Sequence, residues 1–115
     1  MFTKYTLDLV EKKQAEARRR SRRLCIDTAV IGANGTVREG ARLIDLSMNG
    51  ARLEAPFPLP FLSHVCLRFI LPGSTREFNL PGWVTWSKEA GEKGWWEARV
   101  QFKQNHWEIN QLLPL

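Results

Sequence analysis

The sequence has few of the features that assign a chain to a disulfide-rich, metal-binding or membrane-spanning class. It has two cysteines among 115 residues, Cys25 and Cys66, and these form no metal-spaced pair. No apolar run approaches the roughly 20 residues that a membrane helix needs, and the N-terminus lacks the apolar centre of a signal peptide. Because both thiols lie in apolar stretches, we expect buried free cysteines in a cytoplasmic protein without a membrane span.

The residue sets that most enzymes require are also missing. The two histidines, His64 and His106, are far apart and neighbour apolar or aromatic residues, and neither has a second ligand at metal spacing. No phosphate-binding loop of the GxxxxGK or GxGxxG kind occurs. The sequence therefore predicts a protein that is not an enzyme and that holds no metal and no cofactor.

Positive charge is abundant, and it is concentrated near the N-terminus. The formal net charge is +5, and residues 1–23 contain eight basic and three acidic side chains, whereas residues 24–115 contain nine of each. Five arginines fall within residues 18–23. A guanidinium is a planar fork that matches phosphate oxygens or the edge of guanine. The run therefore indicates an anion-binding segment, although a solvated basic tail has the same composition.

The hydrophobic pattern changes along the chain from a helical one to a period of two. Residues 3–17 are mostly good helix formers with a thin apolar stripe, which predicts an N-terminal arm over residues 1–17 that is at most marginally helical. Beyond Leu24 apolar and polar residues alternate, as in half-buried strands. We expect each of the three late strands to bury one face. The buried residues would be Val65, Leu67, Phe69 and Leu71 in the first strand, Phe78, Leu80, Val84 and Trp86 in the second, and Trp96, Ala98, Val100 and Phe102 in the third.

Turn residues separate six such segments, at 32–35, 48–50 and 72–74 among others. Short strands in succession without intervening helices predict a mainly all-β fold, a six-stranded antiparallel barrel, because closure removes exposed edges. Asn105 and Glu108 resemble a helix cap, which predicts a short C-terminal helix over 105–113. One barrel domain would then cover residues 18–115. Trp83 and Trp95 fall opposite the apolar stripes and are candidates for a surface contact.

One predicted turn combines groups suited to a guanine ligand. Residues 45–50 read DLSMNG at the junction of two expected strands. Asp45 and Ser47 should point the same way, and Gly50 lets the backbone turn and a flat ligand approach. A carboxylate accepts from the N1–H and N2–H₂ groups of guanine, and arginine binds O6 and N7 or a phosphate. The arginine run and this turn together suit a guanine-containing phosphodiester, although a plain Asx turn has the same pattern.

In combination, the two elements resemble the PilZ domain, the bacterial receptor module for cyclic di-GMP. That family has an RxxxR motif before the first strand, matched by Arg19 to Arg23, and a [D/N]xSxxG motif, matched by Asp45 to Gly50. Arg18 to Arg22 is an alternative register of the first motif. The resemblance extends over residues 18–113, including the late strands 82–86 and 96–102.

The resemblance implies a site for cyclic di-GMP. Arg19 and Arg23 would bind guanine and phosphate, Asp45 and Ser47 would hydrogen-bond a guanine edge, and Gly50 would set the backbone shape. Arg18 occupies a position where an arginine in the family accompanies an intercalated ligand dimer.

The resemblance also implies a signalling mechanism. The N-terminal arm would clamp over the barrel when the ligand relieves arginine repulsion, and an unidentified downstream protein would read the result. The process in this family ranges over motility, secretion and polysaccharide synthesis.

Three alternatives stay open: an RNA- or single-stranded-DNA-binding barrel, a PilZ-like adaptor without ligand, and a flavin-binding barrel enzyme. The two intact motifs favour the receptor over the adaptor. A steep salt dependence would identify a nucleic acid binder, and a colourless protein would argue against a flavin.

Overall fold

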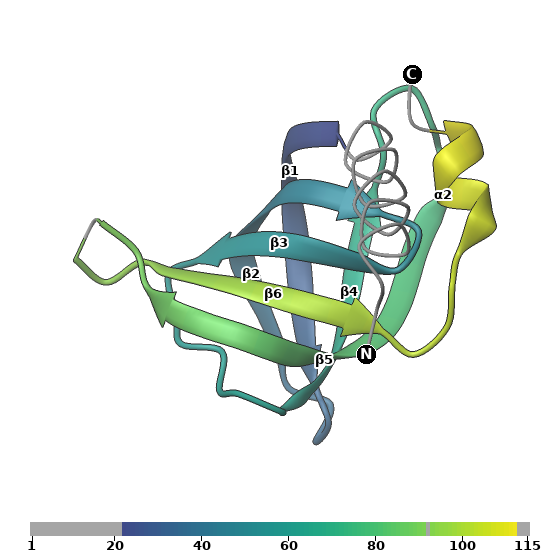
Figure 1. The fold of residues 1–115 in the computed structure, drawn as a ribbon. Helices are drawn as coiled ribbons and strands as arrows, with labels where there is room; N and C mark the ends of the chain where they lie inside the picture. The colour runs from purple at the N-terminus through teal and green to yellow at the C-terminus, as the bar shows by residue number, and fades with distance from the viewer. Residues whose placement is uncertain (1–21, 92, 113–115) are drawn as a thin grey trace, which may run out of the picture.

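The computed structural model, which describes residues 22–91 and 93–112, is a closed antiparallel barrel of six strands (Figure 1). The order around the barrel is β1-β2-β3-β6-β5-β4. This confirms the predicted fold class, whereas the expected arm over residues 1–17 lies outside the described residues. The elements are β1 (Arg22–Gly32), β2 (Val37–Ser47), β3 (Gly50–Ala55), β4 (His64–Ile70), β5 (Glu77–Glu89), β6 (Trp96–Phe102) and α2 (Trp107–Leu112).

Short turns join the strands where the sequence predicts them. Between β1 and β2 the Gly35 amide donates to the Gly32 carbonyl at 2.9 Å, and Gly35 has a φ of 83°, a value that suits glycine. Met48 and Asn49 alone connect β2 to β3. After β4, Gly73 has a φ of 78°. Such short connections keep consecutive strands antiparallel and adjacent.

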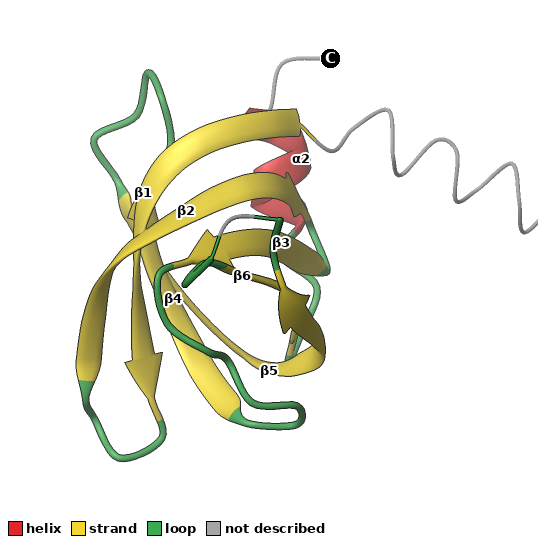
Figure 2. Cartoon of the chain, turned by 90° about the vertical axis from the view of Figure 1, so that its left-hand side faces the viewer, coloured by secondary structure: helices red, strands yellow, loops and turns green. Residues whose placement is uncertain are grey.

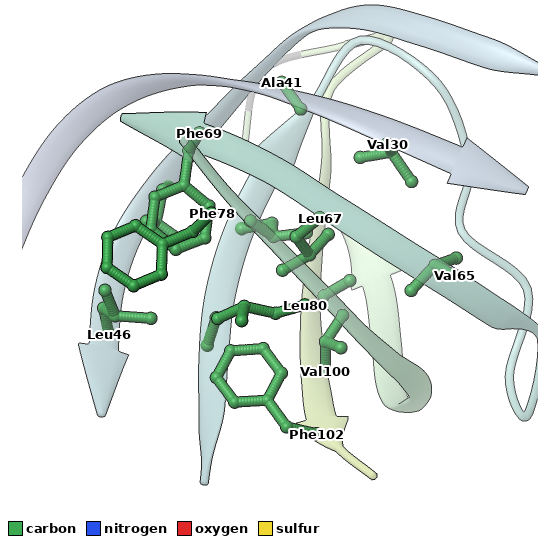
Figure 3. Packing of buried hydrophobic residues seen from close by; sticks show 14 of the residues in the cluster. Val30, Ala41, Leu46, Val65, Leu67, Phe69, Phe78, Leu80, Val100 and Phe102 are labelled. Carbon is green, nitrogen blue, oxygen red and sulfur yellow. The ribbon is translucent and has the colours of Figure 1, made fainter. Parts of the chain in front are cut away.

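Alternate strand residues point inward and fill the barrel (Figure 3). Phe69 and Phe78 stack with their ring centroids 5.6 Å apart, and Leu67 is fully buried between the strands. Ile109 of α2 is also fully buried, and the helix lies at one end of the barrel (Figure 2). Each such side chain contributes roughly 1.5–3 kcal/mol through its burial, so the core accounts for the closed shape.

Trp86 does not join the core, contrary to the sequence prediction. The pairing of β5 with β6 shifts by one residue between Val84, which lies opposite Val100, and Trp86, which lies opposite Arg99. The extra residue Thr85 makes a β-bulge, which reverses the inward and outward alternation. Trp86 is therefore 37% exposed, whereas Val84 is fully buried.

The cysteines also differ from expectation, because Cys25 is exposed and only Cys66 is half-buried; both are free thiols. Burial raises the pKa of the Cys66 thiol, against a smaller opposing effect of Arg68. Trp83, Trp95 and Trp96 are each half-buried.

The C-terminal helix begins at Trp107, so His106, rather than Asn105, precedes its first residue. Within the described part of the chain, no helix is long and apolar enough to cross a membrane.

Candidate ligand-binding site

A hollow of about 430 Å³ opens on the outer face of the barrel, over the ends of β2 and β3 and across β5 and β6. It brings together three of the predicted site residues, Asp45, Ser47 and Gly50. The other lining residues are Leu46, Asn49, Ala51, Arg52, Thr85, Arg99, Val100 and Gln101.

A β-bulge in β2 turns Asp45 and Ser47 toward this hollow. The pairing of β2 with β3 shifts between Leu43 and Asp45, so Ile44 is the extra residue and both Leu43 and Ile44 are buried. Beyond the bulge Leu46 points inward, and Asp45 and Ser47 lie half-buried on the outer face. The structure thus confirms that the two polar side chains share one side of the strand.

The turn that follows is fixed by hydrogen bonds on both sides. The Ser47 hydroxyl donates to Asn49 Oδ1 at 2.8 Å, with the Gly50 carbonyl oxygen 3.3 Å away as a second acceptor. The Asn49 carbonyl accepts from the Phe102 amide at 2.9 Å. These contacts give the rim of the hollow one defined shape.

Gly50 is required by close packing rather than by the turn. A Cβ at this position would lie 2.7 Å from the Val100 carbonyl oxygen, a separation that real Cβ atoms essentially never show. Gly50 is absent from the glycines with positive φ among the described residues. The glycine of the second motif therefore lets β6 approach β3 at the floor of the hollow.

Arg52 is the main residue of the hollow that the sequence interpretation missed. Its Nη2 lies 2.9 Å from Asp45 Oδ2, and its Nη1 lies 3.4 Å from Glu97 Oε1. Arg52 stands directly opposite Asp45 on one side and Arg99 on the other. Arg52 alternates with the buried Ala51 and Leu53, which places it on the outer face of β3, but its neighbours depend on the order of the strands.

Asp45, Arg52, Arg99 and Trp86 lie opposite one another in turn on β2, β3, β6 and β5, and so form one row across the strands. Arg99 lies opposite Trp86, and its guanidinium carbon is 5.7 Å from the indole centroid. The Lys88 ammonium also lies over this ring, at 5.2 Å. With Asp45 as acceptor and Arg52 and Arg99 as cations, the site suits a ligand that has both hydrogen-bond donors and negative charge.

The described backbone extends this row to the arginine motif. Arg23 in β1 lies directly opposite Asp45, whereas Arg22 lies opposite the buried Leu46. The row across β1, β2, β3, β6 and β5 is thus Arg23, Asp45, Arg52, Arg99 and Trp86. The predicted ligand residues Arg18 and Arg19 lie outside the described residues.

Within residues 22–91 and 93–112, no three side chains of His, Cys, Asp or Glu gather in a way that could hold a metal ion. The hollow is lined by carboxylate, guanidinium, hydroxyl and amide groups.

Comparison with known proteins gives a family match over most of the chain. The sequence model of the PilZ domain matches residues 17–113. A search of curated proteins found no match.

Solved structures share the fold at low sequence identity. Bacillus subtilis MotI/DgrA, an inhibitor of motility, is 12% identical with a TM-score of 0.64, over 81% of this chain and 45% of that one. The PilZ domain of CeSA from a cellulose-synthesizing bacterium is 19% identical with a TM-score of 0.53, over 81% and 89%. Borreliella burgdorferi PlzA, in complex with c-di-GMP, is 10% identical with a TM-score of 0.56, over 92% and 55%. The chain thus spans about half the length of MotI/DgrA and PlzA.

Proposed function

Because the chain belongs to the PilZ domain family, we propose that it is a non-catalytic receptor for cyclic di-GMP. The observation that carries the proposal is the pairing of its two motifs. Arg23, the last residue of RxxxR, lies opposite Asp45, the first residue of DxSxxG, and Asp45, Ser47 and Gly50 line one hollow. PlzA, which shares the fold, has a structure in complex with c-di-GMP.

Different residues of the site bind different chemical groups of the ligand. Asp45 accepts from the N1–H and N2–H₂ groups of a guanine, and the Ser47 hydroxyl adds a donor or acceptor beside it. Arg19 and Arg23 bind phosphate oxygens or the O6 and N7 atoms of guanine. Arg99 adds positive charge to the described part of the site, which favours a ligand with two phosphates, whereas the charge of Arg52 is offset by Asp45 and Glu97.

Ligand binding acts on the segment that precedes the barrel. Five arginines in residues 18–23 repel one another, and a dianionic ligand removes that repulsion. We propose that the arm then settles over the hollow and that a downstream protein binds the surface so formed. Arg18 supports binding of two stacked cyclic di-GMP molecules. The function places the chain in the bacterial cytoplasm, where it shares a compartment with this ligand.

Calorimetric titration of the full chain with cyclic di-GMP tests the proposal. The wild type should bind, the Arg19→Ala/Arg23→Ala variant should release little or no heat, and the stoichiometry separates one ligand from two. Arg42→Ala/Arg68→Ala is the matched control, because it removes the same charge from barrel arginines that do not line the hollow. A wild type that does not bind would refute the proposal and leave the adaptor or nucleic acid binder, to be tested next with RNA.

A further inference from the structure

Arg52 contacts two carboxylates, Asp45 and Glu97, although one carboxylate would be enough to balance its charge. The two Nη atoms of one guanidinium reach carboxylates on two different strands, Asp45 on β2 and Glu97 on β6. The Arg52 side chain is only 31% exposed, and its buried Nε makes no hydrogen bond in the structure. Arg52 is therefore held in one orientation by its two anchors and by the barrel surface beneath it.

We propose that Arg52 is a positioning residue that fixes the Asp45 carboxylate for reading the N2 amino group of guanine. It thereby sets how strongly the site discriminates guanine from a base that lacks this group. The inference rests on the proposed function and adds the residue that makes the site specific for its base.

The chemistry of a carboxylate supports this role. Two oxygens offer about four lone-pair sites, so the bond from Arg52 to Oδ2 leaves Asp45 able to accept the parallel N1–H and N2–H donors of guanine. Such a pair of bonds requires the carboxylate plane to match the base edge. One Nη of Arg52 contacts Asp45 and the other contacts Glu97, so the guanidinium is anchored on both sides and holds Asp45 Oδ2 in one place, which the single ammonium of a lysine would not do.

The fixed carboxylate is also the source of discrimination. Inosine has N1–H but no N2 amino group, so it leaves one Asp45 acceptor without a donor. Asp45 is half-buried and is held by Arg52, so an acceptor left without a donor beneath the bound base costs more than the missing bond alone. A carboxylate released from Arg52 is able to rotate toward water or toward N1–H alone, and guanine then loses most of its advantage.

The test is calorimetric titration of the full chain with cyclic di-GMP and with cyclic di-inosine monophosphate. In the wild type the ratio of the two Kd values should be about tenfold or more, as expected for a bond to a charged acceptor. In Arg52→Ala the ratio should fall below about threefold. Arg52→Lys should give a ratio between these values, because a lysine ammonium lacks the second Nη that Arg52 extends to Glu97.

Two further variants separate positioning from a loss of charge or structure. Arg42→Ala removes a β2 arginine that packs 4.6 Å over the Trp95 ring outside the hollow, and it should keep the wild-type ratio. In an Asp45→Asn background, Arg52→Ala should lower the ratio no further, because its effect passes through Asp45. Should Arg52→Ala fail to fold by circular dichroism, Arg52→Lys and Glu97→Gln take its place, and both should lower the ratio.

The outcomes distinguish this inference from the proposed function. Equal weakening of both ligands in Arg52→Ala, with the wild-type ratio kept, would overturn the inference while leaving the receptor intact. A further loss of discrimination in the Asp45→Asn background would overturn it as well. A wild type that binds neither ligand would instead refute the proposed function.

Discussion

The backbone amide of His106 donates a hydrogen bond to the Met48 carbonyl oxygen over 2.7 Å. Met48 lies in the turn between the two strands whose ends form the hollow, and His106 immediately precedes α2. The Asn110 amide group also donates to the Met48 sulfur at 3.3 Å. The C-terminal helix is therefore tied to the rim of the candidate site, although the two are about sixty residues apart in sequence.

This tie predicts that loosening α2 weakens ligand binding from a distance. Ile109→Ala removes the fully buried side chain that anchors the helix, and we expect it to lower the free energy of unfolding by about 2–4 kcal/mol. It should also weaken cyclic di-GMP binding, measured by titration at a temperature where the variant is folded. Gln111→Ala, an exposed change in the same helix, should leave both quantities unchanged. Unaltered affinity in a destabilised Ile109→Ala would show that the turn keeps its shape without α2.

Substitution of the motif glycine should act through the backbone of β6. Gly50→Ala places a Cβ against the Val100 carbonyl, and such overpacking costs typically 1–3 kcal/mol. We expect a lower urea midpoint together with weaker ligand binding, because the floor of the hollow must shift. Gly91→Ala is the matched control, since its Cβ would meet nothing within 4 Å. Equal midpoints for the two variants would contradict the close packing of β3 and β6.

The two cysteines should differ in reactivity. The thiolate is the reactive form, and burial raises the pKa of Cys66, so its alkylation by iodoacetamide at neutral pH should be slower than that of the exposed Cys25 and should increase at higher pH. Because the raised pKa favours the neutral thiol in the folded state, the stability from Cys66 is present at neutral pH and is lost as pH rises through that pKa. Peptide mass spectrometry measures both rates, with Cys25→Ser as the control. Faster labelling of Cys66 in the folded protein would contradict the prediction.

The alternation of residues predicted much of the barrel. Val65, Leu67 and Phe69 are buried as their spacing indicates, because β4 pairs with β5 without a register shift. Trp86 breaks the pattern because the extra residue at Thr85 reverses the phase of β5. A bulge depends on the partner strand, so local periodicity could not reveal it.

The residues of the candidate site that are close in sequence could be predicted, whereas contacts between residues on strands far apart in sequence could not. Asp45 and Ser47 precede the turn between β2 and β3, and Gly50 follows it, so their shared hollow follows from their spacing in the sequence. The contact of Arg52 with Glu97 requires β3 to lie beside β6, which skips β4 and β5 in the order of the barrel. Hydrophobic patterns do not record that order.

Salt dependence should separate the proposed ligand from the nucleic acid alternative. Each phosphate contact of a polynucleotide contributes a slope of roughly 0.7–0.9 in a plot of log affinity against log salt concentration, because counterions condensed on the strand are released. Cyclic di-GMP has only two phosphates and lacks a polynucleotide's condensed counterions, so a slope of about 2 is an upper bound for one bound molecule, and its affinity should fall by no more than about twentyfold between 50 and 200 mM salt. A single-stranded RNA held by the basic arm would contact several phosphates and lose affinity far more steeply. Titrations of both ligands at three salt concentrations measure the slopes, and tight RNA binding with a steep slope, together with weak binding of cyclic di-GMP, would favour the nucleic acid binder over the receptor.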